Sequence, residues 1–318
     1  MLYFNFAFAT ELHVKSLRIS IVEYLNTAPL VGGFTHGPLR GKFELSFTVP
    51  SQCAEALRAG AVDVAIIPAI EYHRIADLVI LPNLSIASKR SVRSLLLISK
   101  KPLYEVARIA LDRSSRSTQA LTRILCEKHW HIAPEFVEAA PDLPAMLHQA
   151  DAALLIGDPA LRLAVATASQ SRREASGELV SPASAAGFSS PGSLFIYDIV
   201  EEWFALTGLP AVLAVWAARR DVVTPELVQD FQDSLAFGLQ HLDDIAAGAA
   251  ATMHLPAAEL RRYLAENIDY HLDDENLEGL ARYYQYASEL GLITASLRPI
   301  EVAAQPREGN LSRVGADL

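Results

Sequence analysis

Hydroxyl side chains gather at the start of one predicted helix, in the stretch DRSSRSTQA at residues 112–120. They belong to Ser114, Ser115, Ser117 and Thr118. Hydroxyls and free backbone N–H groups would meet there at the positive end of the helix dipole, an arrangement that binds anions. Arg116 could add a fork for a carboxylate. The alternative is a helix cap with surplus serines, but a cap needs only one side chain, so we favour an anion-binding site.

Two further polar pairs follow predicted strands. Asn26 and Thr27 come soon after the apolar run at 17–22, and Gly157 and Asp158 follow the run AALLI. Open α/β sheets bind ligands beyond the carboxyl ends of their strands, so we expect Asn26 and Thr27 either to face a ligand or to cap the next helix. Gly157 would let a ligand approach the backbone closely. For Asp158, a helix cap is the favoured interpretation.

A third polar group precedes a strand of leucine and isoleucine, in the stretch SKRSVRS at 88–94. Ser91, Arg93 and Ser94 could contribute hydrogen-bond donors from a loop at a cleft. Taken alone, the stretch is better explained as a solvated basic turn.

Several familiar chemistries lack their sequence motifs. The chain has no G-x-G-x-x-G, G-x-x-x-x-G-K-[ST], G-x-S-x-G or H-E-x-x-H, which removes the usual grounds for dinucleotide, nucleotide-triphosphate, serine-hydrolase and zincin functions. His129 and His131 have no carboxylate or cysteine at a suitable spacing, so we expect no metal site. Cys53 and Cys126 are expected to be reduced and buried. Glu71 is either a carboxylate at a helix N-terminus or a candidate base.

The composition is that of a globular protein, with 51% hydrophobic and 20% charged residues among 318. A net charge of −10 argues against nucleic acid, because phosphates require a basic face. The N-terminal residues have no basic segment before their apolar part, unlike a signal peptide, and every apolar run is too short to span a bilayer. We therefore expect a cytoplasmic monomer or homodimer that binds neither nucleic acid nor membrane.

Strands and helices alternate around the polar groups. The first part of the chain contains strand-like runs at 17–22, 43–50 and 61–68. A short helix, QCAEALRAG, lies between the second and the third run, with Ser51 as its cap and Gly60 as its stop. This order predicts a parallel sheet covered by helices.

A second strand-and-helix series follows, and the chain after 224 has helical spacing. We predict an α/β protein with two lobes, a ligand cleft between them and C-terminal helices. The first lobe is expected at 17–103 plus 211–293, the second at 104–210, and loose tails at 1–16 and 296–318.

Five strings in fixed order carry a family resemblance: YLNTAPL, VPSQCAEALRAGAVDVAIIPAIEY, LPNLSIASKRSVRSLLLISKKPL, LLIGDPAL and YDIVEEWFALTGLPAVLAVWAAR. Together they resemble the chorismate dehydratases of the futalosine pathway of menaquinone biosynthesis, over residues 17–293. The resemblance implies a type 2 periplasmic-binding-protein fold. It also implies a lyase reaction, the conversion of chorismate to 3-[(1-carboxyvinyl)oxy]benzoate with loss of water, without a metal or organic cofactor.

The resemblance also implies site residues. The family's active-site asparagine matches Asn26, and its active-site serine matches Ser94. The hydroxyl-rich helix start corresponds to Ser115, Ser117 and Thr118. The family often has Gly-Pro where this chain has Arg90 and Ser91, which puts the role of Ser91 in question.

The matched positions contain no histidine, lysine or carboxylate to act as a base. We hypothesise that the enolpyruvyl carboxylate of the substrate accepts the proton itself. A side-chain base such as Glu71 is the rival hypothesis.

Two other functions stay open. The 1,4-dihydroxy-6-naphthoate synthase of the same pathway shares this architecture but is expected to use a cleft histidine, and no histidine here falls in a strand-end motif. A non-catalytic protein that binds a small dicarboxylate would use the same hydroxyls and arginines, although no export signal is visible.

Overall fold

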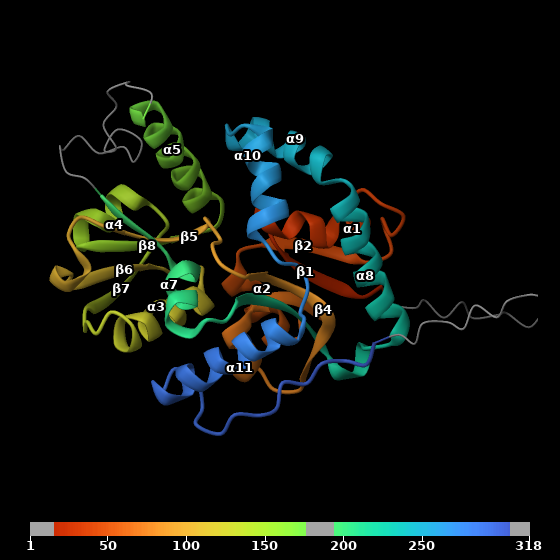
Figure 1. The fold of residues 1–318 in the computed structure, drawn as a ribbon. Helices are drawn as coiled ribbons and strands as arrows, with labels where there is room; N and C mark the ends of the chain where they lie inside the picture. The colour runs from red at the N-terminus through yellow and green to blue at the C-terminus, as the bar shows by residue number, and fades with distance from the viewer. Residues whose placement is uncertain (1–15, 176–193, 306–318) are drawn as a thin grey trace, which may run out of the picture.

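The computed structural model describes residues 16–175 and 194–305. Within them the chain forms two five-stranded sheets with helices packed around each (Figure 1). The α/β class expected from the sequence is confirmed. Among the described residues, no helix combines the length and the apolar character needed to cross a membrane.

The first sheet has the strand order β2-β1-β3-β10-β4. β1 (Arg18–Val22) pairs in parallel with β2 (Glu44–Thr48) and with β3 (Val64–Pro68). β10 (Ala211–Arg219) lies antiparallel between β3 and β4 (Leu78–Ser88). The return of the strand near 211 to the first sheet agrees with the sequence prediction.

The second sheet has the order β7-β6-β8-β5-β9. Its strands are β5 (Leu95–Ser99), β6 (Arg108–Asp112), β7 (Glu135–Ala139), β8 (Ala152–Ile156) and β9 (Phe195–Asp198). β6 is parallel to β7 and β8, whereas β5 is antiparallel to β8 and β9. Successive side chains of β5 enter two different buried apolar clusters. The sheet is therefore covered on both faces, which explains the uninterrupted apolar run of this strand.

Helices connect the strands and form most of the C-terminal part. In the first lobe they are the 3-10 helix η1 (Leu25–Val31), α1 (Gly32–Thr35), α2 (Pro50–Arg58) and η2 (Ala69–His73). In the second they are η3 (Leu103–Glu105), α3 (Arg116–Lys128), α4 (Leu143–Gln149), α5 (Gly157–Ala175) and α7 (Ile199–Thr207). After β10 come η4 (Arg220–Val222), α8 (Pro225–Gln240), α9 (Leu242–Met253), α10 (Ala257–Arg262), the π-helical segment η5 (Tyr263–Asn267) and α11 (Asp274–Glu289).

The start of α2 differs from the sequence prediction. Val49 occupies the N-cap position without a side-chain hydrogen bond, and Pro50 is the first helical residue. Proline suits this position because it lacks the N–H that would be unpaired there and its φ is already helical. Ser51 therefore lies inside the helix, and its prediction as the cap is wrong. Gly60, with φ of 71°, ends the helix region as predicted.

The chain crosses from the first sheet to the second between Ser88 and Leu95, and it returns through α7. We call residues 89–94 the crossing segment. The predicted lobe boundary at 103 left β5 in the first lobe, whereas its pairing with β8 and β9 places it in the second sheet. The change of sheet thus comes earlier in the chain than the sequence suggested.

Helix α8 fixes the segment that follows β1. A Cβ atom on Gly238 would lie 2.0 Å from the carbonyl oxygen of Pro29, so only glycine permits this contact. The hydroxyl of Ser234 donates to the carbonyl oxygen of Leu30 (2.9 Å) and accepts from the backbone N–H of Gly33 (3.1 Å). These contacts hold η1, which carries Asn26 and Thr27, against the C-terminal helices.

The outer edge of β4 is covered by two later segments. Ser85 and Ala87 donate backbone hydrogen bonds to residues 270 and 269. Further along the same edge, Ile80 exchanges backbone hydrogen bonds with residues 301 and 303.

The start of the predicted C-terminal tail is therefore fixed. The hydroxyl of Tyr72 donates to the carbonyl oxygen of Pro299 (3.0 Å) and accepts from the N–H of Glu301 (2.8 Å). The expectation of a loose chain after 296 is wrong for these residues. Residues 1–15 and 306–318 of the predicted tails lie outside the described residues.

Candidate active site

A small cavity lies between the two sheets, and we call it the inner cavity. Its volume is about 60 Å³, which is several times the ~10–15 Å³ that one water molecule needs on the same measure. Its polar lining residues come from both lobes and from the crossing segment. They are Tyr24, Asn26, Thr27, Ser94, Ser115, Ser117 and Thr118. The lining contains hydroxyls and one amide but no histidine, lysine, arginine or carboxylate among the described residues.

Asn26 and Thr27 reach the inner cavity from η1, directly beyond the carboxyl end of β1. The N-cap of η1 is Tyr24, which makes no side-chain capping bond, so Asn26 and Thr27 are not caps. The hydroxyl of Thr27 donates to Oδ1 of Asn26 at 3.3 Å. The sequence left open whether Asn26 and Thr27 cap a helix or face a ligand site, and in the structure they line the cavity.

Ser94 ends the crossing segment and is almost fully buried, with 1% of its surface exposed. Its hydroxyl accepts a hydrogen bond from the hydroxyl of Tyr263 at 2.9 Å. Its carbonyl oxygen accepts from the backbone N–H of Gly157 at 2.8 Å. Gly157, with φ of 65°, also lines the inner cavity. Ser94 and Asn26 therefore share one cavity although 68 positions separate them in the chain.

The hydroxyl groups at the start of α3 do not serve as backbone caps. Ser115 occupies the N-cap position, but its hydroxyl donates to Oγ1 of Thr118 at 2.8 Å. The hydroxyl of Ser117 accepts from the N–H of Ile70 in the first lobe at 3.2 Å. Ser114 lies just outside the lining and donates to Oδ1 of Asp112 at 2.7 Å. The helix start thus offers the cavity hydroxyls, together with the N–H groups that begin every helix.

The structure does not bring the two predicted arginines into the inner cavity. Arg116 turns to Glu55 (2.6 Å) and Glu71 (3.2 Å), and Arg93 turns to Glu259 (3.2 Å). Carboxylates of the same chain thus occupy the guanidinium forks that the sequence assigned to a ligand.

Ser91 and Asp158 also have other partners. Ser91 donates to Oδ2 of Asp198 at 3.0 Å. Asp158 lies inside the first turn of α5, and its Oδ1 accepts from the N–H of Leu25 at 3.1 Å. The favoured prediction that Asp158 caps the helix is therefore wrong, because its recorded backbone partner belongs to η1 in the other lobe.

Glu71 is fully buried and does not line the inner cavity. Its carboxylate binds Arg58, Arg74 (2.9 Å) and Arg116 (3.2 Å). Three guanidinium groups around one carboxylate leave it poorly placed to take a proton from a ligand.

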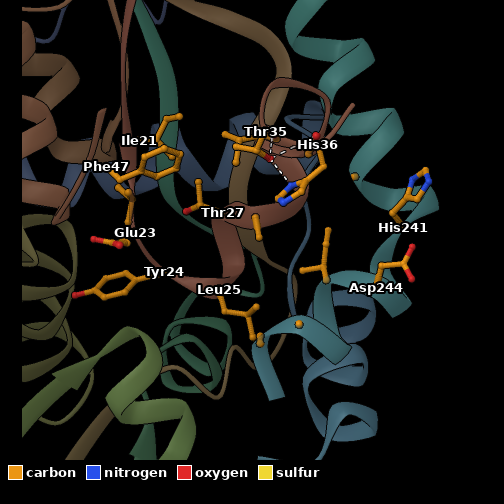
Figure 2. A pocket seen from close by; sticks show the side chains of 18 of the residues that line it. Ile21, Glu23, Tyr24, Leu25, Thr27, Thr35, His36, Phe47, His241 and Asp244 are labelled. Atoms are coloured by element: carbon orange, nitrogen blue, oxygen red, sulfur yellow. Dashed lines mark hydrogen bonds between the residues drawn. The ribbon is translucent and has the colours of Figure 1, made fainter. Parts of the chain in front are cut away.

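A larger groove of about 970 Å³ lies beside the inner cavity, and we call it the outer groove. Figure 2 shows Tyr24 and Thr27 on one side of it and His241 and Asp244 on the other. Tyr24 and Thr27 line both spaces, so they separate the groove from the cavity. A Cβ on Gly157 would lie 2.8 Å from the ring of Tyr24, and the Tyr24 hydroxyl lies 3.5 Å from that of Ser114. Burial raises the pKa of the Tyr24 phenol, so this group is neutral near pH 7.

Comparisons with known proteins identify the family of the chain. A family model described as menaquinone biosynthesis matches residues 17–289. The chain belongs to the menaquinone biosynthesis family. A relative from Thermus thermophilus, named chorismate dehydratase, is 30% identical over 277 residues, which are 86% of this chain and 95% of the relative.

Solved structures identify the fold of this family member. Protein AF1704 from Archaeoglobus fulgidus matches with a TM-score of 0.66 at 20% identity, over 88% of this chain and 100% of its own. The periplasmic aliphatic sulphonate binding protein SsuA from Escherichia coli matches with a TM-score of 0.56 at 18% identity, over 88% of this chain and 94% of its own. The periplasmic-binding-protein fold expected from the sequence is confirmed.

Tyr263 and Tyr24 are the site residues that the sequence reasoning missed. Tyr24 stands two positions before Asn26 in the string YLNTAPL, so its place beside the cavity had a local signal. Tyr263 stands in RRYLAEN, which looks like an ordinary helix. Only the packing of the C-terminal helices on the crossing segment brings its hydroxyl to Ser94.

Proposed function

We propose that this member of the menaquinone biosynthesis family is a chorismate dehydratase that acts in the cytoplasm as part of the futalosine pathway. The observation that carries the proposal is that Asn26, Ser94 and the hydroxyl-rich start of α3 line one cavity between the lobes. The name of the Thermus relative supports the same reaction.

The proposed reaction removes water from the ring of chorismate. A proton leaves the ring carbon that bears the enolpyruvyl ether, and the neighbouring hydroxyl departs with a proton as water. The carbanion formed is conjugated with the ring carboxylate, so donors on that carboxylate stabilise the developing dienolate. Ser115, Ser117 and Thr118 at the start of α3 are suited to this task, because the helix dipole adds to their hydrogen bonds. The ring then becomes aromatic.

Asn26 and Ser94 would act on the other side of the substrate. The amide of Asn26 can both donate and accept hydrogen bonds, so it is suited to orient the leaving hydroxyl or the enolpyruvyl group. Ser94 already accepts a hydrogen bond from Tyr263, which leaves its own proton available for a ligand oxygen.

The base in this proposal is the enolpyruvyl carboxylate of the substrate. No lining side chain of the inner cavity is a carboxylate, histidine or lysine among the described residues, and Glu71 is bound by arginines. The lobes would hold the carboxylate near the ring C–H, and such positioning can supply a large part of a rate enhancement. The absence of histidine from this lining also disfavours the naphthoate synthase alternative.

Substrate entry requires the lobes to separate. The polar lining residues Ser94, Ser115, Ser117 and Thr118 are all buried, so a ligand can reach them only when the lobes move apart. Hinge opening around a ligand is the characteristic motion of periplasmic binding proteins. The outer groove, which shares Tyr24 and Thr27 with the cavity, is the proposed entrance.

The test is incubation of the purified protein with chorismate, followed by ultraviolet absorbance and mass spectrometry of the product. Asn26→Ala and Ser94→Ala should each lower kcat by about 10²- to 10³-fold, the usual effect of removing one donor that acts on developing charge. Ser85→Ala is the matched control, because this buried serine donates to the carbonyl oxygen of residue 271 and not to the cavity. Binding of chorismate without any spectral change would overturn the proposal in favour of a dicarboxylate-binding protein.

A further inference from the structure

One face of the C-terminal helical segment contacts the crossing segment at three points. Glu259 of α10 pairs with Arg93 (3.2 Å), and the side-chain amide of Asn267 donates to the carbonyl oxygen of Ser91 (2.9 Å). Between them, the hydroxyl of Tyr263 donates to Ser94 at 2.9 Å. The three helical residues are spaced four apart, so they lie on one face of the helix.

The helix changes its winding at this contact. Tyr263 is the first residue of the π-helical segment η5, which ends at Asn267. Such segments are rare, interrupt the regular α-helical ladder and occur frequently at functional sites. Without the wider turn, residues after Tyr263 would be rotated relative to their observed directions, since each residue of an α-helix turns by ~100°. The π segment therefore coincides with the two contacts that Tyr263 and Asn267 make with the crossing segment.

The hydroxyl of Tyr263 contacts one of the two predicted catalytic residues. It donates to the hydroxyl oxygen of Ser94 at 2.9 Å, so the proton of Ser94 stays free to bind a ligand oxygen. Ser94 shares the inner cavity with Asn26, whose amide oxygen accepts from the hydroxyl of Thr27. One hydroxyl thus fixes the direction of the Ser94 hydroxyl.

The environment keeps this proton in place. Tyr263 is 1% exposed, and burial raises the pKa of its phenol above the ordinary value. It does not line the inner cavity, so it acts on a ligand only through Ser94.

We propose that Tyr263 is the positioning residue of this site, whose hydroxyl orients the Ser94 hydroxyl toward the substrate. The inference rests on the proposed function and extends it to a residue outside the cavity lining. A displacement of a reacting group by about 1 Å can lower the rate by about 100-fold.

The test compares Tyr263→Phe with Tyr270→Phe. Tyr270 is 3% exposed, and its hydroxyl has no hydrogen-bond partner, so Tyr270→Phe removes a buried phenol oxygen that orients nothing. Tyr263→Phe should lower kcat on chorismate by about 10- to 100-fold with a small change in KM, while Tyr270→Phe should retain the wild-type kcat. A kcat of Tyr263→Phe within twofold of that of Tyr270→Phe would overturn the inference.

A double-mutant cycle with Ser94→Ala distinguishes positioning from a general loss of structure. If Tyr263 acts through Ser94, then Tyr263→Phe should cost little further activity in the Ser94→Ala background. Losses that multiply in the double variant would overturn the inference, because a merely structural role predicts that result.

Wild-type protein that leaves chorismate unchanged would instead overturn the proposed function. The same cycle is then read from calorimetric binding of 3-[(1-carboxyvinyl)oxy]benzoate. Coupled losses of affinity in Tyr263→Phe and Ser94→Ala would support the positioning role, and independent losses would refute it.

Discussion

Replacement of Asp198 by alanine should destabilise the protein by about 3 kcal/mol. This carboxylate is the N-cap of α7, where Oδ1 accepts from the N–H groups of Val200 (2.9 Å) and Glu201 (3.3 Å). Its other oxygen accepts from the crossing segment, at 3.0 Å from the N–H of Val92 and 2.7 Å from that of Arg93. One side chain therefore joins α7 to the segment that leads into Ser94.

The magnitude follows from the groups left without a partner. A lost N-cap costs about 1 kcal/mol. Each buried N–H without an acceptor costs about 1–3 kcal/mol, and Val92 is fully buried. Burial raises the pKa of the Asp198 carboxyl, which shows that desolvation offsets part of the hydrogen bonding, so the lower figures apply. Their sum is about 3 kcal/mol.

Urea unfolding followed by circular dichroism measures this loss, with Asp142→Ala as the matched control. Asp142 is the exposed N-cap of α4 and accepts a single bond, from the N–H of Ala145 at 3.0 Å, so its loss should cost only about 1 kcal/mol. A cost for Asp198→Ala no greater than that for Asp142→Ala would refute the claim that this carboxylate stabilises the crossing segment.

Two further predictions concern the cavity wall and a half-buried histidine. Gly157→Ala should lower the free energy of unfolding, measured in urea, by more than Gly208→Ala. Both glycines have a left-handed backbone, but only at Gly157 would the new Cβ meet the Tyr24 ring, at 2.8 Å. Equal losses in the two variants would exclude a steric role for this contact. Burial, and then the charge of Arg298, lower the pKa of His73 from 6.5 to about 4. Below pH 6.5 His73 is therefore protonated in the unfolded chain but not in the folded chain. The free energy of unfolding should fall toward pH 4 by up to about 1.4 kcal/mol per pH unit, and solvent screening makes this slope smaller. His73→Phe should remove this part of the slope, and an unchanged slope would contradict the assignment.

The sequence predicted the strands well because their apolar runs are short and bounded by clear stop signals. It misplaced β5 because the same kind of run suits either sheet, and only pairing with β8 and β9 decides between them. It misplaced the start of α2 because Ser51 is a good cap by type, whereas Pro50 had already begun the helix.

For the site, the sequence identified the residues that follow strands or begin helices. Asn26, Ser94 and the α3 hydroxyls do line one cavity. It failed for Arg93 and Arg116 because a guanidinium binds any nearby carboxylate, and their partners Glu259 and Glu55 come from distant parts of the chain. The directions of such side chains depend on tertiary packing, which no local pattern records.

The covered edge of β4 has a consequence for the behaviour of the protein at high concentration. β4 is an eleven-residue strand that is buried along nearly its whole length. A long apolar strand with unpaired N–H and C=O groups would invite intermolecular β-pairing, the first step toward aggregation. In this chain the backbone around 269 and 301 occupies that edge. The residues around 301 therefore protect the protein against aggregation as well as completing the fold. They do not line the inner cavity.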